Sequence, residues 1–228
     1  MTTIAGSRVL VLGGSGGLGR ALVAAFAVGG ARVVSSGARD GADPVSGAEV
    51  HVVGDITSSD DRERIVDAAL EHLGGLDVVV LASGVVGFGS ADTVRSADLQ
   101  RLIDVDLTGP LAFLGLVGPE VSEGGSVVVL TGAIVDSPIP GTSAYAGAKA
   151  GLSSAAVVIG RELRRRKVTV IDARPPHTET GLADRALFGA APTFPAGLTA
   201  DAVAARIVTA IEAGERELPP AAFTTGAA

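Results

Sequence analysis

The sequence predicts an α/β fold in which a doubly wound, mostly parallel sheet carries helices on both faces. Short apolar runs of strand length alternate with helix-length segments along most of the chain. The first apolar run leads directly into a glycine-rich turn, a feature of sheets that bind dinucleotides. No linker, composition break or internal repeat divides the 228 residues, so a single domain spanning residues 1–228 is expected.

The N-terminal half opens with a strand, a glycine turn and a helix. Arg8–Leu12 (RVLVL) is an uninterrupted apolar run, typical of a strand buried on both faces. Five glycines lie within residues 13–19, and an apolar helix is expected over Arg20–Val28. The next elements expected are strands at Arg32–Ser36 and Val50–Val53, a helix that begins near Ser58–Asp61, and a strand at Asp77–Leu81.

The C-terminal half continues this alternation. A long, largely apolar helix is expected over Ala97–Val117, and the valine-rich run Ser126–Leu130 predicts another strand. The remaining elements expected are a helix at Thr142–Arg165, a strand at Val168–Ala173, and an amphipathic helix at Thr199–Ala213 with Thr199 as its N-cap.

Glycines between a strand and a helix have a physical use at a phosphate site. They allow a tight turn, a close approach of the backbone to a ligand, and close packing of the helix on the strand. The helix N-terminus that follows presents free N–H groups to a pyrophosphate. The segment Gly13, Ser15, Gly17, Leu18 and Gly19 is therefore interpreted as part of a dinucleotide-binding loop, with a merely flexible turn as the alternative.

The ends of the second and third strands bear on the choice of cofactor. NAD-preferring sites place an acidic residue near the second strand end, where it binds the ribose hydroxyls. The segment Ser35–Arg39 (SSGAR) contains no carboxylate. Arg39 or the serines, Ser36 among them, would instead receive a 2′-phosphate, which favours NADP(H) over NAD(H). Asp55 follows the third strand and is interpreted either as a purine contact or as a cap of the next helix.

The chemical argument depends on Tyr145 and Lys149. Tyr145 is the only tyrosine, Lys149 is one of two lysines, and their spacing places them one turn apart on the same helix face. A free phenol has a pKa of about 10, and a nearby ammonium lowers that pKa by stabilising the phenolate. The pair can therefore act as a general acid/base near neutral pH. The alternative is a core tyrosine and a solvated lysine at helical spacing by chance.

Composition argues against several classes of function. The chain has no cysteine, which excludes disulfides, thiol nucleophiles and cysteine-based zinc sites, and its three scattered histidines make a metal site unexpected. A net charge of −7, with a basic tract only at residues 161–167, argues against nucleic acid as a partner. With no signal peptide and no apolar run of about 18 residues, a cytoplasmic protein without membrane contact is expected.

The glycine loop, the buried strands and the Tyr-x-x-x-Lys pair resemble, in this order, the short-chain dehydrogenase/reductase family over roughly Ser7 to Glu217. The resemblance implies a Rossmann-type domain with a seven-stranded sheet. It implies that Tyr145 exchanges a proton with the substrate oxygen, while Lys149 lowers the pKa of that tyrosine and binds the nicotinamide ribose. The cofactor-binding positions expected are Gly13, Ser15, Gly17, Leu18, Gly19, Ser36, Arg39, Asp55, Ile56, Ala82, Ser83, Gly84, Tyr145, Lys149, Pro175 and Thr180.

Several positions depart from the family pattern around the reacting centre. Gly132 lies thirteen residues before Tyr145, where the family has a serine that positions and polarises the carbonyl, and glycine cannot donate that hydrogen bond. Asp106 aligns with a helix asparagine that supports a proton relay to the lysine, so it is interpreted as a modified relay residue. Pro176 replaces a glycine, and the family's Asn-Asn-Ala-Gly stretch reads Leu81–Gly84 (LASG).

Two explanations of these departures remain open. In the first, the protein is an NADP(H)-dependent oxidoreductase that interconverts a carbonyl and an alcohol, and His177, Thr131 or Thr178 supplies the missing polar group. In the second, the cofactor pocket serves a non-redox cyclase, isomerase or lyase that uses Tyr145 as acid/base, or a nucleotide-sensing or structural subunit.

The substrate and the assembly are expected to involve the C-terminal half and the long helices. The segment Gly181–Gly197 is expected to be a loop with a short helix that covers the substrate as a lid. Its phenylalanines and prolines suggest a small apolar or cyclic substrate. The resemblance implies a homodimer or homotetramer formed through the helices Ala97–Val117 and Thr142–Arg165, whose small residues allow close packing.

Overall fold

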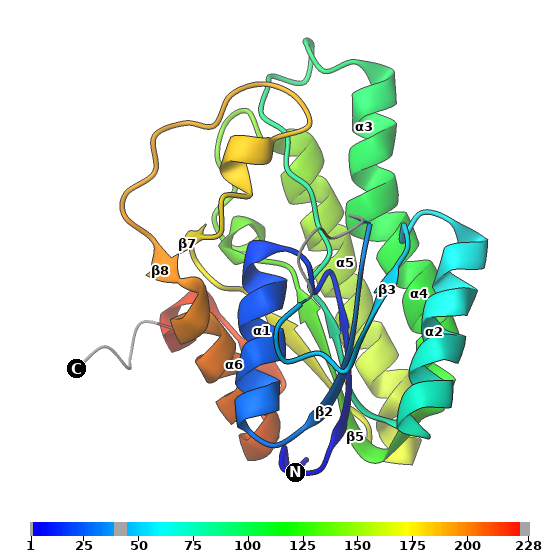
Figure 1. The fold of residues 1–228 in the computed structure, drawn as a ribbon. Helices are drawn as coiled ribbons and strands as arrows, with labels where there is room; N and C mark the ends of the chain where they lie inside the picture. The colour runs from blue at the N-terminus through cyan, green and yellow to red at the C-terminus, as the bar shows by residue number, and fades with distance from the viewer. Residues whose placement is uncertain (1, 39–44, 224–228) are drawn as a thin grey trace.

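The computed structural model describes residues 2–38 and 45–223 of the chain, so Arg39 lies outside the described residues. Within these ranges a seven-stranded parallel sheet has the order β3-β2-β1-β4-β5-β6-β9 (Figure 1). The strands are β1 (Arg8–Leu12), β2 (Arg32–Gly37), β3 (Val50–Val53), β4 (Leu76–Leu81), β5 (Val121–Leu130), β6 (Thr169–Ala173) and β9 (Glu217–Leu218). This confirms the predicted doubly wound, Rossmann-type fold. The sequence pattern does not indicate β9, because two residues are too few to show a period.

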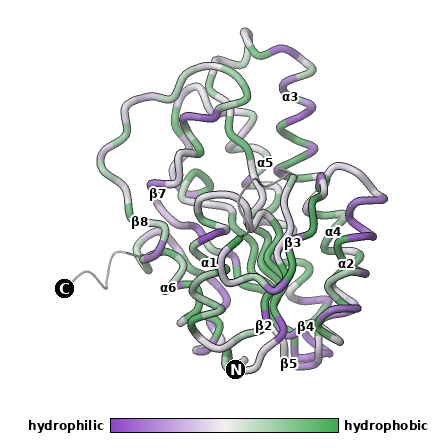
Figure 2. The backbone as a smooth tube through the Cα atoms, viewed as in Figure 1, coloured by the Kyte–Doolittle hydropathy of each residue, from purple (hydrophilic) through white to green (hydrophobic). Residues whose placement is uncertain are grey.

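Helices cover both faces of this sheet. On one face lie α1 (Gly17–Val28) and α6 (Ala200–Ala213), and on the other lie α2 (Ser59–Leu73), α4 (Gly109–Val117) and α5 (Ser143–Glu162). Alternate strand residues point into the two cores: Val9 and Val11 pack with Phe26 of α1, whereas Leu10 and Leu12 pack on the opposite side. Figure 2 shows the resulting concentration of hydrophobic residues along the central strands.

The long helix expected over Ala97–Val117 is interrupted by a turn of π-helix. It consists of α3 (Ser96–Ile103), the π-helical turn η1 (Asp104–Thr108) and α4, all with right-handed backbone angles. Such turns often occur at functional sites, and Asp106 lies in this one. By length and composition alone, Ser96–Glu120 would suffice to cross a membrane, but half of its most apolar window is buried inside the fold.

The predicted lid is held at both of its ends. Thr178–Glu179 (β7) and Leu198–Thr199 (β8) pair in parallel, and the segment between them contains the short 3-10 helix η5 (Ala183–Arg185). The middle of this segment docks on the chain that follows β4, where backbone hydrogen bonds join Phe88 to Phe188 and Leu187 to Val86. The predicted short helix is thus a single 3-10 turn, and Thr199 caps α6 as expected.

An ion pair joins the amino ends of β1 and β4. Arg8 Nη2 lies 2.7 Å from Asp77 Oδ1, Nε donates to Oδ2 at 2.9 Å, and both side chains are half-buried. Hydrogen bonds from Arg8 and desolvation act in opposite directions on Asp77, and the hydrogen bonds prevail and lower the pKa of Asp77. A carboxyl whose folded pKa is depressed contributes stability above its unfolded pKa and loses it as the pH falls.

We therefore expect Arg8→Gln to lower the free energy of unfolding by about 1 kcal/mol at pH 7. The deficit should be smaller near pH 3 than at pH 7, because below the ordinary pKa of an aspartate the unfolded chain binds a proton at Asp77 that the folded ion pair resists. Urea denaturation at the two pH values checks this, with the exposed Arg64→Gln as a control of small effect. An equal deficit at both pH values would contradict the assignment.

Candidate active site

A cavity of about 700 Å³ opens at the carboxyl ends of the strands, where the strand order changes direction between β1 and β4. In doubly wound sheets this crevice is where ligands bind. Its walls are the glycine loop after β1, the segments that follow the other strands, the start of α5 and the lid. The predicted site residues that line it are Gly13, Ser15, Gly17, Leu18, Gly19, Asp55, Ile56, Ala82, Ser83, Gly84, Thr131, Tyr145, Lys149, Pro175, His177 and Thr180.

The glycine loop is packed so closely that side chains would not fit. A Cβ on Gly13, which has φ +85°, would lie 2.4 Å from the backbone nitrogen of Ser83. A Cβ on Gly19 would lie 2.0 Å from the carbonyl oxygen of Gly13, and one on Gly17 would lie 2.7 Å from that of Thr180. The loop therefore brings the backbone N–H groups at the start of α1 to the cavity wall, which is the arrangement that binds a diphosphate.

The ends of β2 and β3 differ in part from expectation. The side chain of Ser36 is buried and does not line the cavity, because it points into the α2 side of the sheet. Its carbonyl oxygen instead accepts hydrogen bonds from the amides of Gly13 and Gly14, so Ser36 supports the glycine loop rather than a ligand. Asp55 lines the cavity and accepts hydrogen bonds from Thr57. It does not cap α2, whose N-cap is Ser58.

Lys149 and Asp106 form a buried ion pair beneath the cavity. Lys149 Nζ lies 3.2 Å from Asp106 Oδ1, and their side chains are 5% and 0% exposed. The ammonium also donates to the carbonyl oxygen of Leu130 at 3.3 Å, and Oδ1 accepts from the Val85 amide at 3.2 Å. Burial opposes the charge on Lys149, but Asp106 and Tyr145 together outweigh burial and raise the pKa of that lysine. Asp106, which aligns with the family's helix asparagine, is thus in direct contact with Lys149.

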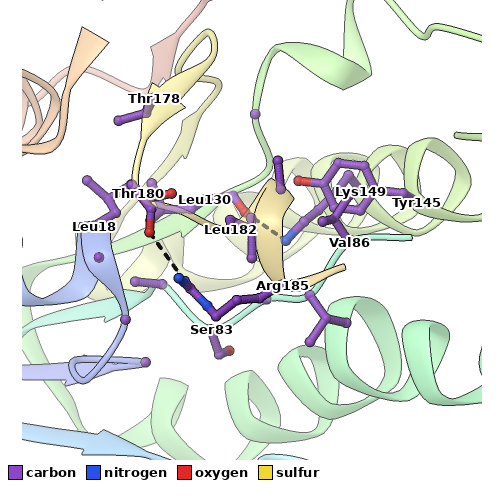
Figure 3. A pocket seen from close by; sticks show the side chains of 18 of the residues that line it. Leu18, Ser83, Val86, Leu130, Tyr145, Lys149, Thr178, Thr180, Leu182 and Arg185 are labelled. Carbon is purple, nitrogen blue, oxygen red and sulfur yellow. Dashed lines mark hydrogen bonds between the residues drawn. The ribbon is translucent and has the colours of Figure 1, made fainter. Parts of the chain in front are cut away.

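Tyr145 is half-buried at the wall of the same cavity. Lys149 Nζ lies 5.8 Å from the centre of its ring, and Figure 3 shows the phenol oxygen and the ammonium on the same side of α5. Burial raises the pKa of Tyr145, the Lys149 ammonium lowers it, and the Asp106 carboxylate raises it again, with a net increase. At neutral pH the hydroxyl is therefore a protonated phenol, which suits it to donate a proton.

Gly132 leaves no side-chain donor where the family pattern has a serine. Its backbone angles, φ +85° and ψ 161°, belong to a region that L-residues rarely adopt. A Cβ there would have room, since the nearest atom is the Pro175 carbonyl oxygen at 3.8 Å. The obstacle to a serine is thus the local backbone and not the space.

Two of the residues predicted to replace that serine already donate their hydroxyl protons to other groups. Thr131 Oγ1 donates at 2.5 Å to the buried carboxylate of Asp172, which also accepts from Ser153 at 2.6 Å. Its one proton is used there, so the geometry does not support Thr131 as the carbonyl donor. The hydroxyl proton of Thr178 is also in use, because that hydroxyl donates to the carbonyl oxygen of Pro176.

His177 lies at the cavity wall, where its ring stacks against the lid. Its ring stacks on Phe194 of the lid with centroids 4.7 Å apart, and its Nε2 lies 3.5 Å from Glu179. Phe88 packs against the same phenylalanine at 6.4 Å. These contacts line this part of the cavity wall with aromatic rings.

Some wall residues were not indicated by the sequence pattern. Phe88 follows β4, Arg101 reaches the wall from α3 and bonds Asp55 at 2.9 Å, and Arg185 belongs to the lid. Arg185 donates to the carbonyl oxygen of Thr180 at 3.2 Å and extends across the cavity in Figure 3. No motif marks them, because each reaches the cavity through a tertiary contact.

A diphosphate cradle at one end of a cavity and a tyrosine–lysine pair at the other define a dinucleotide-binding α/β enzyme site. The family model described as short chain dehydrogenase matches residues 7–187, so the chain belongs to that family.

Known proteins agree with this assignment. An uncharacterized oxidoreductase of Methylorubrum extorquens is 31% identical over 189 residues, which cover 79% of this chain and 76% of that protein. The cyclic-di-GMP-binding biofilm dispersal mediator protein of Escherichia coli K12 is 30% identical, with the same two coverages. A short chain dehydrogenase of Burkholderia cenocepacia in complex with NADP has the same fold, with a TM-score of 0.84 and 24% identity over 96% of this chain and 97% of that chain.

Proposed function

We propose that this protein is an NADP(H)-dependent oxidoreductase that interconverts a carbonyl and an alcohol on a small apolar or cyclic substrate. The observation that carries the proposal is the placement of Tyr145 and Lys149 at one end of a cavity whose other end is the glycine loop. Family membership supports oxidoreductase chemistry, and the apolar lid contacts of Phe88, His177 and Phe194 support the substrate class.

The residues present fit a nicotinamide dinucleotide. The amides at Gly17–Gly19 would hold the diphosphate, Asp55 and Ile56 would border the adenine, and Lys149 would bind the nicotinamide ribose. Ala82, Ser83, Gly84, Pro175 and Thr180 would complete the nicotinamide end, and Ser83 Oγ is a buried hydroxyl with no partner among the described residues. When bound, the cofactor supplies or accepts the hydride.

Residues of this chain would carry out the proton transfer. In reduction, the Tyr145 phenol donates its proton to the carbonyl oxygen while Lys149 stabilises the phenolate that remains. Gly132 has no side chain and Thr131 is bonded to Asp172, so Tyr145 and His177 are the predicted site residues left to polarise the carbonyl. The loss of one such donor typically lowers a rate by about 100- to 1000-fold, so a modest turnover number is expected.

The first prediction concerns the proton donor. Tyr145→Phe should abolish carbonyl-dependent oxidation of NADPH, because only the hydroxyl is removed, while NADPH binding stays within about threefold of the wild type. The measurement is nicotinamide absorbance against a panel of carbonyl compounds, with binding followed by nicotinamide fluorescence. Substrate conversion that needs Tyr145 without change in nicotinamide absorbance would favour a non-redox lyase or isomerase. Cofactor binding without any Tyr145-dependent conversion would favour a binding subunit.

The second prediction concerns the cofactor. The described end of β2, Ser35 to Ala38, contains no carboxylate for ribose hydroxyls, and Arg39 follows it directly. NADPH should therefore bind more tightly than NADH, and Arg39→Ala should weaken NADPH by about tenfold while leaving NADH unchanged. Titration of both cofactors checks this. An unchanged affinity ratio would show that Arg39 does not receive the 2′-phosphate.

The third prediction concerns assembly, which we propose to be a homodimer or homotetramer. Leu116 of α4 and Val157 and Val158 of α5 are 38%, 44% and 48% exposed, which leaves an apolar strip on the outer helices. Val158→Glu should dissociate the oligomer in size-exclusion chromatography with light scattering, because it buries a charge at the interface. Val28→Glu is the matched control, since Val28 is 90% exposed on α1. A wild-type monomer, or an unaffected oligomer, would contradict the proposed surface.

A further inference from the structure

Asp106 is completely buried, and only one of its two carboxylate oxygens has a partner among the described residues. Oδ1 faces both the Lys149 ammonium and the Val85 amide, whereas Oδ2 has no partner among the described residues. Gly84 packs directly against the pair, because a Cβ on that glycine would lie 3.0 Å from Asp106 Oδ1 and 3.3 Å from Lys149 Nζ. The carboxylate therefore acts on Lys149 in surroundings with little water to screen it.

We propose that Asp106 is a positioning residue that balances the charge of Lys149, so that Tyr145 keeps its proton to higher pH than a phenol beside an unopposed ammonium would. The inference rests on the function proposed above and adds a pH dependence to it. Proton donation to a carbonyl oxygen needs the phenol, so this step should persist to higher pH than it would without Asp106. An asparagine would leave the ammonium unopposed and favour the phenolate.

The other charged groups near Tyr145 are engaged elsewhere. From the segment after β6, His177 stacks on Phe194 and faces Glu179. Asp172 of β6 is satisfied by Thr131 and Ser153.

From the lid, Arg185 is bonded to the backbone of Thr180, and Asp184 beside it is exposed. Burial is the largest cause that raises the pKa of Tyr145; of the charges, Lys149, on the same helix, lowers it and Asp106, on η1, raises it. The two charges thus modulate, in opposite directions, a pKa that burial has already raised.

The composition of the chain allows a direct test. Tyr145 is the only tyrosine and there is no tryptophan, so the near-ultraviolet absorbance of tyrosinate reports this one side chain. The titration uses the cofactor-free protein and needs no substrate, so its outcome is separate from that of the redox assays. Circular dichroism at each pH establishes that the chain is still folded.

In the wild type, the tyrosinate midpoint should lie above that of a free phenol, about 10. Asp106→Asn should move it to lower pH by about one unit, because the amide keeps the Val85 hydrogen bond but not the charge. Asp104→Asn is the matched control: Asp104 lies in the same turn and accepts a hydrogen bond from Gln100, so it should leave the midpoint unchanged. Lys149→Met should move the midpoint upward.

Two results would overturn the proposal. One is a tyrosinate midpoint in the folded wild-type protein that lies below that of free tyrosine. This measurement does not depend on the folding of any variant. The other is an Asp106→Asn midpoint equal to that of the wild type or of Asp104→Asn. If Asp106→Asn does not fold, Asp106→Glu retains the charge and should keep the wild-type midpoint, and a downward shift in that variant would also contradict the proposal.

Discussion

The buried ion pair between Lys149 and Asp106 is the interaction on which the rest of the site depends. It joins α5 to the π-helical turn, and the ammonium also holds the end of β5 through the Leu130 carbonyl. Such a pair contributes little net stability, because desolvation offsets most of the attraction, but removal of one partner leaves a buried charge at a cost of about 3–5 kcal/mol. The two residues therefore constrain each other, and the pair fixes a cation near the phenol of Tyr145 at the wall of the cavity.

The departures from the family pattern around this pair have a common physical meaning. Gly132 removes a side-chain donor, and its positive φ shows that the backbone has a conformation that a serine would rarely adopt. Asp106 adds a negative charge where the pattern has a neutral amide. In the proposed reaction, the first change removes one donor to the carbonyl oxygen, and the second would strengthen the hold of Tyr145 on its proton. Both changes would make the reaction depend more heavily on Tyr145.

The fold and the glycine loop follow from the sequence because they depend on local pattern. Apolar runs such as Arg8–Leu12 are typical of buried parallel strands, and the Cβ positions at Gly13, Gly17 and Gly19 show why the loop that follows needs glycine. The positions of individual side chains around the cavity do not follow in the same way. The engagement of Thr131 by Asp172, the inward turn of Ser36 and the reach of Arg185 are set by contacts between segments far apart in the chain, and the π-helical turn has no sequence signature.

A crystal structure with NADPH bound would show whether this cavity presents a nicotinamide to Tyr145 over an intact Lys149–Asp106 pair. We expect the diphosphate at the amides of Gly17–Gly19, the ribose against Lys149, and the reactive face of the nicotinamide beside the Tyr145 hydroxyl, with Thr131 still bonded to Asp172. A cofactor that leaves the Tyr145 end empty, or a Lys149 that has separated from Asp106, would contradict this expectation.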